Sequence, residues 1–164
     1  MRHILLALVL VTGCGADAGG NNASPAKRSG KVDLSTLTGL YEGGASLQPN
    51  QICMVSDAPD RAAFGIVVRG ANSCAGSGTA ERQANDLRLT MSGDQPCTLD
   101  ARVDGGRVIL PAAVPESCAY YCSTGATLAG LSFDKKGSSR QDAMKAIDPV
   151  GEALCAGLAA PSRP

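Results

Sequence analysis

Seven cysteines constrain this chain of 164 residues more than any other feature of its sequence. One of them, Cys14, stands near the start, and the other six are Cys53, Cys74, Cys97, Cys118, Cys122 and Cys155. An even set of cysteines in an oxidising compartment predicts disulfides, so these six predict three bridges. The sequence leaves their pairing open. We favour the pairs Cys53–Cys74, Cys97–Cys118 and Cys122–Cys155, because each closes a loop of moderate length.

A metal or redox site explains these cysteines less well. The sequence has no Cys-x-x-Cys pair, which is the spacing typical of zinc sites and of thioredoxin-type motifs. Cys118 and Cys122 have three residues between them, and most of the other gaps are about twenty residues. We therefore expect neither a metal nor a cofactor, and we interpret Cys118 and Cys122 as structural.

The first residues have the pattern of a secretory leader. A short basic start, Met1-Arg2-His3, is followed by the apolar run Ile4–Val11 and then by Thr12, Gly13 and Cys14. A membrane span needs about 20 apolar residues, so this run predicts a signal peptide. The segment Val11-Thr12-Gly13-Cys14 resembles the lipobox of bacterial lipoproteins, in which an aliphatic residue and two small residues precede a cysteine.

This resemblance implies that residues 1–13 are cleaved off and that the sulfur of Cys14 carries a lipid. It also implies that Gly15, in the sorting position, favours the outer membrane, with the protein facing the periplasm. The protein would then contact the membrane through its lipid anchor. An ordinary secretory peptide with a free Cys14 is the alternative. Lipidation of Cys14 would leave the even set of six cysteines, which agrees with the prediction of three disulfides.

Composition and periodicity divide the rest of the chain. Residues 14–32 lack apolar periodicity and predict a flexible tether. Residues 33–158 predict a single β-rich domain with a C-terminal helical segment, and residues 159–164 predict a loose tail. The candidate strands are Leu37–Glu42, Gln51–Ser56, Ala63–Arg69, Gly76–Arg82, Asn85–Met91, Cys97–Val103, Val108–Leu110 and Ala126–Phe133. About eight short strands with glycine-rich turns predict a small antiparallel barrel or sandwich, stapled by disulfides.

The register of two strands can be tested on the sequence. Pairing Met91 with Cys97 places Leu89 opposite Leu99 on one face and Arg88 opposite Asp100 on the other. Opposite charges are favourable cross-strand neighbours, so this register is internally consistent. Near the C-terminus, Ser139-Arg140-Gln141-Asp142 fits a helix capping box. Asp148-Pro149 predicts the start of a second short helix over residues 150–156.

The composition excludes several classes of function. Fifteen basic residues balance fifteen acidic ones, which argues against a nucleic-acid partner. The only histidine is His3, within the predicted leader, so the mature chain has no imidazole for a catalytic triad. No nucleophile or acid-base pair stands out, and Trp is absent. We therefore expect a protein that is not an enzyme.

Tyr120 and Tyr121 are the candidate protein-binding residues. They lie side by side between Cys118 and Cys122, and rigid exposed tyrosines are good anchors for a protein partner. The alternative is that one ring packs on a disulfide and the other lies half exposed. The sequence thus predicts a noncatalytic binding domain for an envelope or secreted protein or a small ligand. A structural or assembly role in the outer membrane remains open, and inhibition of lysozyme or of a protease is an analogy of size and strand pattern alone.

Overall fold

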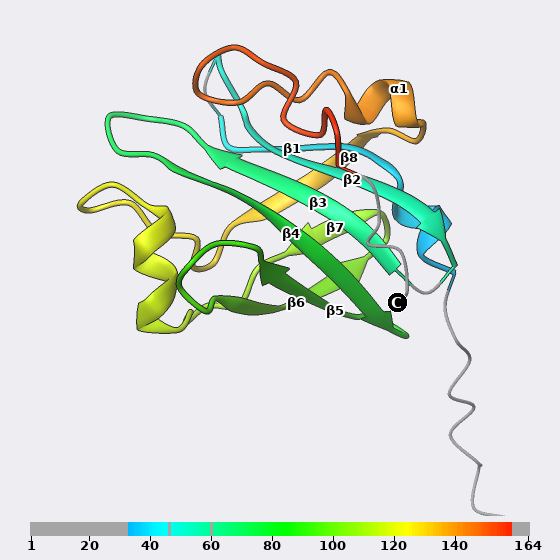
Figure 1. The fold of residues 1–164 in the computed structure, drawn as a ribbon, viewed down its shortest axis with the longest axis horizontal. Helices are drawn as coiled ribbons and strands as arrows, with labels where there is room; N and C mark the ends of the chain where they lie inside the picture. Colours follow the sequence, from blue (N-terminus) through cyan, green and yellow to red (C-terminus); the bar gives the residue numbers. More distant parts are fainter. Residues whose placement is uncertain (1–32, 46, 60, 159–164) are drawn as a thin grey trace, which may run out of the picture.

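The computed structural model describes residues 33–45, 47–59 and 61–158. The predicted signal peptide, the lipidation site Cys14, the tether over residues 14–32 and the tail over residues 159–164 lie outside the described residues. The described chain forms a closed barrel of eight antiparallel strands in which each strand pairs with the next and β8 pairs with β1 (Figure 1). The predicted mainly β fold is therefore confirmed, and it is a barrel rather than a sandwich.

The strands are short and follow the chain in meander order. Their bounds are β1 Gly39–Gly43, β2 Asn50–Ala58, β3 Arg61–Val68, β4 Cys74–Gln83, β5 Asp86–Met91, β6 Thr98–Asp104, β7 Arg107–Ile109 and β8 Ser132–Gly137. The helical elements are the 3-10 helices η1 Leu34–Leu37 and η2 Glu116–Tyr121 and the α-helix α1 Arg140–Ala143. The register expected for β5 and β6 is confirmed, because Leu89 pairs with Leu99 and Arg88 with Asp100.

Alternation along the strands sends one set of side chains into the barrel. The bulkiest of them are fully buried and fill the interior: Tyr41, Ile52, Met54, Phe64, Ile66, Leu87, Leu89, Leu99 and Phe133. On β5 the buried and exposed residues alternate strictly, because the outer face of this strand is open to water. On β3 seven consecutive residues are buried, so both of its faces are covered.

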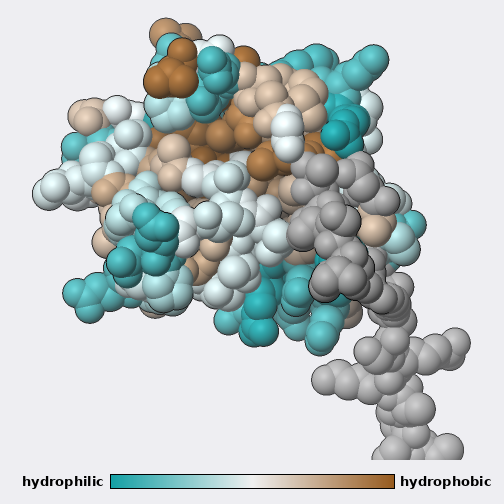
Figure 2. All heavy atoms as spheres, viewed as in Figure 1, coloured by the Kyte–Doolittle hydropathy of each residue, from teal (hydrophilic) through white to brown (hydrophobic). Residues whose placement is uncertain are grey.

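The C-terminal strap, which we define as residues 138–158, covers the outer face of β1 to β3. A second apolar cluster forms there between the strands and the strap, with Leu40, Cys53 and Val55 on one side and Ala143, Ala146 and Cys155 on the other. Figure 2 shows a band of apolar residues where the strap crosses the barrel. Gly65 of β3 lies under Leu154, where a Cβ atom would be 2.7 Å from the Leu154 Cγ. The strap therefore packs directly on the β3 backbone.

The strap holds one helix rather than two. Ser139 caps α1 through the expected capping box, in which its side chain accepts from the Asp142 N–H and Asp142 accepts from the Ser139 N–H. The second helix, expected over residues 150–156, does not form, and turns occupy this segment instead. The Asp148 carboxylate accepts from the backbone N–H groups of Val150 and Glu152, and an isolated bridge pairs Ile147 with Ala153.

The last candidate strand was placed too early. The apolar residues of 126–131 lie in a loop, and β8 runs over the more polar segment Ser132–Gly137. Leu128 is buried although it is not in a strand, because the loop carries it into the end of the barrel. Apolar composition alone therefore gave the wrong strand limits here.

The end of the barrel where the described chain begins is closed by η1. Leu34 and Leu37 are buried against the barrel interior. The Tyr41 hydroxyl donates to the Leu37 carbonyl at 2.8 Å, and burial raises the pKa of that phenol above its ordinary value. Lys135 Nζ donates to the Thr36 carbonyl at 2.6 Å and lies 5.5 Å from the centre of the Tyr41 ring. Burial lowers the pKa of Lys135.

All six cysteines of the described chain form disulfides, but two of the three expected pairs were wrong. Cys97–Cys118 is confirmed, with a Cα–Cα distance of 4.8 Å. Cys53 pairs with Cys155 rather than Cys74, and Cys74 pairs with Cys122. The strap explains the difference, because it brings Cys155 back to the outer face of β2. Loop length along the chain gave no indication of this return.

Candidate binding surface

A long connection joins β7 to β8, and two disulfides, Cys97–Cys118 and Cys74–Cys122, tie it to the barrel. We call residues 110–131 the distal connection, because it lies at the end of the barrel opposite η1 (Figure 1). Connections of more than about 12–15 residues inside a compact domain are uncommon and often functional. Function in small β domains is commonly carried by such loops on a rigid scaffold. The distal connection is therefore the leading candidate for a functional site.

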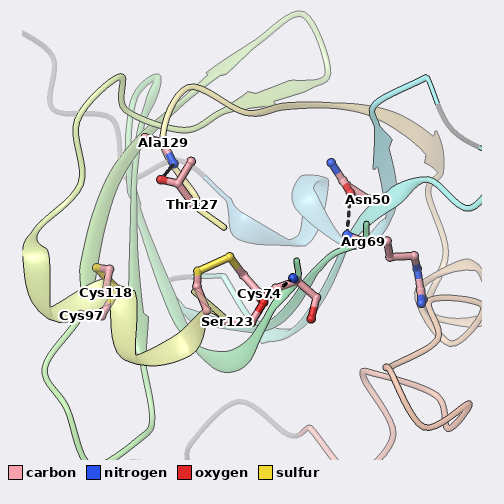
Figure 3. Close-up of a disulfide and its surroundings, with 10 residues drawn as sticks. Asn50, Arg69, Cys74, Cys97, Cys118, Ser123, Thr127 and Ala129 are labelled. Carbon is pink, nitrogen blue, oxygen red and sulfur yellow. Dashed lines mark hydrogen bonds between the residues drawn. A yellow bond between two sulfur atoms is a disulfide. The ribbon is translucent and has the colours of Figure 1, made fainter. Parts of the chain in front are cut away.

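Disulfides and hydrogen bonds hold the distal connection at both ends of η2. Cys118 in η2 bonds to Cys97, just before β6, and Cys122 bonds to Cys74, the first residue of β4. Beside the second bridge, the Ser73 N–H donates to Ser123 Oγ and the Ser123 N–H donates to the Ser73 carbonyl, both at 2.8 Å (Figure 3). A segment tied at so many points keeps one conformation, which lowers the entropy lost on binding.

Tyr121 is a packing residue. Its hydroxyl donates to the Gln95 carbonyl at 2.7 Å and accepts from the Gly93 N–H at 3.1 Å. The ring lies against two glycines: a Cβ on Gly93 would be 2.5 Å from the hydroxyl, and one on Gly76 would be 3.1 Å from the ring. Tyr121 thereby links η2 to the β5–β6 loop and to β4.

Tyr120 is the exposed member of the pair. Its side chain is 58% exposed, whereas Tyr121 is half-buried. The two rings meet edge to face, with centroids 5.2 Å apart and an angle of 83° between their planes. Because Tyr121 is fixed by hydrogen bonds, this contact also orients the Tyr120 ring. An aromatic side chain that is both exposed and oriented is suited to contact a partner at a low entropic cost.

The outer face of β4 to β6 offers a second surface, with a different character. An open hollow of about 350 Å³ lies there, lined by Glu81, Gln83, Asp86, Leu87, Arg88, Asp100, Ala101 and Arg102. Arg88 Nε donates to Asp100 Oδ1 at 2.9 Å, so these two charges of the lining neutralise each other. On the neighbouring face, Arg107 holds Asp134 at 2.6 Å and lowers the pKa of that carboxyl. These are solvated ion pairs, which contribute little to stability.

Metal-binding clusters and membrane-spanning helices are both absent from the described residues. Within residues 33–158, apart from positions 46 and 60, no group of three or more His, Cys, Asp or Glu side chains is placed to hold a metal ion. In the same part of the chain, no helix has the length and hydropathy that a membrane crossing requires. The chain matches no protein-family model, no curated protein and no solved structure.

Sequence reasoning proposed Tyr120 and Tyr121 together as candidate binding residues and missed the residues that partly bury one and leave the other exposed. The assignment of Tyr121 to packing depends on Gly76 and Gly93, which lie in β4 and in the β5–β6 loop. The sequence shows both glycines, but Gly93 lies in the turn-like segment Ser92–Pro96 and Gly76 in the glycine-rich stretch Gly70–Gly78, so neither stood out. Such glycines often mark the close approach of another group.

Proposed function

We propose that this protein is a lipid-anchored lipoprotein of the bacterial envelope whose barrel is a noncatalytic binding domain for a protein partner. The lipidated Cys14 holds it to the outer membrane, and the distal connection with Tyr120 forms the binding surface. The observation that carries this proposal is an exposed tyrosine oriented on a doubly disulfide-bonded segment. Tyr is enriched among the residues that dominate protein interfaces.

Two further observations support the proposal. On the open barrel face Arg88 engages the Asp100 carboxylate at 2.9 Å, so this acid is not a free catalytic group. The three disulfides also agree with folding in an oxidising compartment, as expected of a protein exported to the envelope.

Affinity capture tests the binding role. The protein with its disulfides formed is immobilised, and detergent-solubilised envelope and culture fluid are passed over it. We expect one stoichiometric protein partner, whose affinity falls at least tenfold for Tyr120→Ala. Val150→Ala is the matched control, because Val150 is 81% exposed on the strap. A partner retained equally by both variants, or no partner at all, would overturn the proposed site.

Lipid labelling tests the anchor separately. Cells that express the full chain are grown with radiolabelled palmitate, and we expect label on the wild type and none on Cys14→Ser. Two or more acyl chains anchor a protein firmly, so the wild type should partition into the detergent phase and the variant into the aqueous phase. An unlabelled, water-soluble wild type would contradict the lipoprotein assignment and leave the binding surface to be judged by the capture experiment.

A further inference from the structure

The distal connection contains a small apolar pocket in addition to the exposed Tyr120. It has a volume of about 120 Å³ and lies between η2 and residues 126–128. Most of its lining residues are apolar or disulfide-bonded: Val114, Pro115, Cys118, Ala119, Cys122, Ala126 and Leu128. Ala119 directly precedes Tyr120 in η2, so the pocket and Tyr120 belong to the same segment, the distal connection.

The pocket is formed by the fold and needs no partner to open it. Cys118 and Leu128 are each 1% exposed and are bound into the core of the barrel. On the other wall, the Ala126 N–H donates to the Ser123 carbonyl at 3.0 Å, and Thr127 Oγ1 accepts from the Ala129 N–H at 3.0 Å (Figure 3). These bonds fix the wall. The short side chains of Ala119 and Ala126 leave the space between the walls unfilled.

The size and lining of the pocket define what it can hold. An apolar cavity of about 150 Å³ takes a benzene molecule, so 120 Å³ suits a branched aliphatic group of four carbons, such as a leucine side chain. The hydroxyl of Thr127, the one side-chain hydroxyl in the lining, already accepts a backbone hydrogen bond. Thr127 and Glu116 are the only polar side chains in the lining, so a polar occupant would lose most of its hydration without an equivalent replacement.

Glu116 gives the pocket a charge preference. It is the one charged residue in the lining, and it is exposed at the start of η2. Among the described residues no ion pair involves Glu116, because the salt bridges there are Arg88–Asp100, Arg107–Asp134 and Lys145–Asp142. A cation carried next to the aliphatic group would meet this free carboxylate at the pocket.

We propose that the pocket receives a leucine-like side chain of the protein partner and that Glu116 pairs with a lysine or arginine adjacent to it. This rests on the proposed function, because the pocket and Tyr120 would contact the same partner. It adds a recognition rule: an aliphatic residue followed by a basic one. Shape and apolar lining select the first residue, and charge selects the second.

Short peptides test this rule without the partner. The probe is acetyl-Leu-Lys-amide, with acetyl-Ser-Lys-amide and acetyl-Leu-Glu-amide as comparisons, followed through the methyl NMR signals of Ala119 and Ala126. We expect saturable shifts with a millimolar dissociation constant for the Leu-Lys peptide. Loss of the leucine should weaken binding at least tenfold. Reversal of the peptide charge should weaken it about two- to fivefold, and added salt should remove that difference.

Two variants locate the effect in the pocket. Ala126→Leu fills the space and should abolish the shifts, whereas Glu116→Gln should keep leucine binding and remove the preference for lysine over glutamate. Val150→Ala, far along the strap, should behave as the wild type. Thermal unfolding of each variant shows that it is folded. Equal binding of all three peptides, binding that survives Ala126→Leu, or no saturable shift would each overturn the proposal.

The two proposals can fail separately. If a partner is captured through Tyr120 but binds Ala126→Leu as well as the wild type, the pocket rule is wrong and the binding function stands. If the Leu-Lys peptide binds in the pocket but no protein partner is captured, the pocket rule stands and the proposed protein partner is wrong.

Discussion

The packing of the strap on the barrel can be tested by adding one methyl group at Gly65. A Cβ atom added there would lie 2.7 Å from Leu154 Cγ and 3.2 Å from both the Leu154 carbonyl oxygen and Cys53 Sγ. The contact with Leu154 Cγ is shorter than side chains tolerate. Cγ is the branch point of the leucine, so a simple rotation of its end does not relieve the contact. Gly65→Ala must therefore push the strap away from β3.

The expected loss follows from two opposing terms. Overpacking of a well-packed interface costs about 1–3 kcal/mol. Replacing glycine by alanine also reduces the entropy of the unfolded chain, which stabilises the protein by about 0.4–1 kcal/mol. The net loss should be about 1–2 kcal/mol. In a domain of this size each kcal/mol shifts Tm by about 4 °C, so we expect Gly65→Ala to lower Tm by about 4–8 °C.

A double-mutant cycle in urea, with the disulfides intact, tests the cause. Leu154→Ala removes the Cγ contact and leaves the two contacts of 3.2 Å, which need only a small adjustment. In that background Gly65→Ala should be neutral or slightly stabilising, so the coupling energy should be about 1–2 kcal/mol. If Gly65→Ala costs the same free energy in both backgrounds, Leu154 is not the group that it displaces, and the described packing of the strap is wrong.

Three further predictions concern the disulfides and the titrating groups. Removal of the Cys53–Cys155 disulfide, with a sequence separation of 102, should cost about 5 kcal/mol in chain entropy. Removal of Cys97–Cys118, with a separation of 21, should cost about 3 kcal/mol. Equal losses of unfolding free energy in urea would refute this order. The Asp142 pKa is lowered to about 2 by hydrogen bonds from Lys145 and Ser139, so its stabilising effect is present above the ordinary value of 3.8 and lost as the pH falls through about 2; Ser139→Ala should raise that pKa in an NMR titration. Tyr41→Phe removes the hydrogen bond to Leu37 and should cost about 1 kcal/mol in thermal or urea unfolding at neutral pH. The loss should shrink as the pH rises well above 10, because the raised pKa of the buried phenol then disfavours the folded wild type. A loss that stays constant with pH would refute a buried phenol.

Local sequence patterns predicted β5 and β6 correctly. β5 and β6 have one face in the core and one in water, so apolar and polar residues alternate, and charge pairs such as Arg88–Asp100 fix the register. These cross-strand pairs join residues that lie close along the chain, on either side of one turn. Their register therefore does not depend on contacts with distant segments. Their register was therefore correct residue by residue.

Long-range contacts explain what the sequence could not predict. β3 is buried on both faces because a strap from the other end of the chain lies on it, and the same strap brings Cys155 to Cys53. The return of the strap depends on its packing over β1 to β3, and the spacing of cysteines holds no information about that packing. The apolar residue Leu128 likewise enters the core from a loop, which shifted the predicted position of β8.

Long-range contacts also separate the roles of Tyr120 and Tyr121. In the sequence they are equivalent, since each is an aromatic residue between two cysteines. The partners of the Tyr121 hydroxyl, the Gly93 N–H and the Gln95 carbonyl, come from a distant part of the chain and fix that hydroxyl against the β5–β6 loop. Once Tyr121 is fixed, the 3-10 geometry of η2 places the neighbouring Tyr120 ring in solvent. The residues that stabilise the fold thus select the one that is left to bind, so a variant of Gly93 that displaces Tyr121 should weaken capture of a partner by Tyr120 without touching that partner.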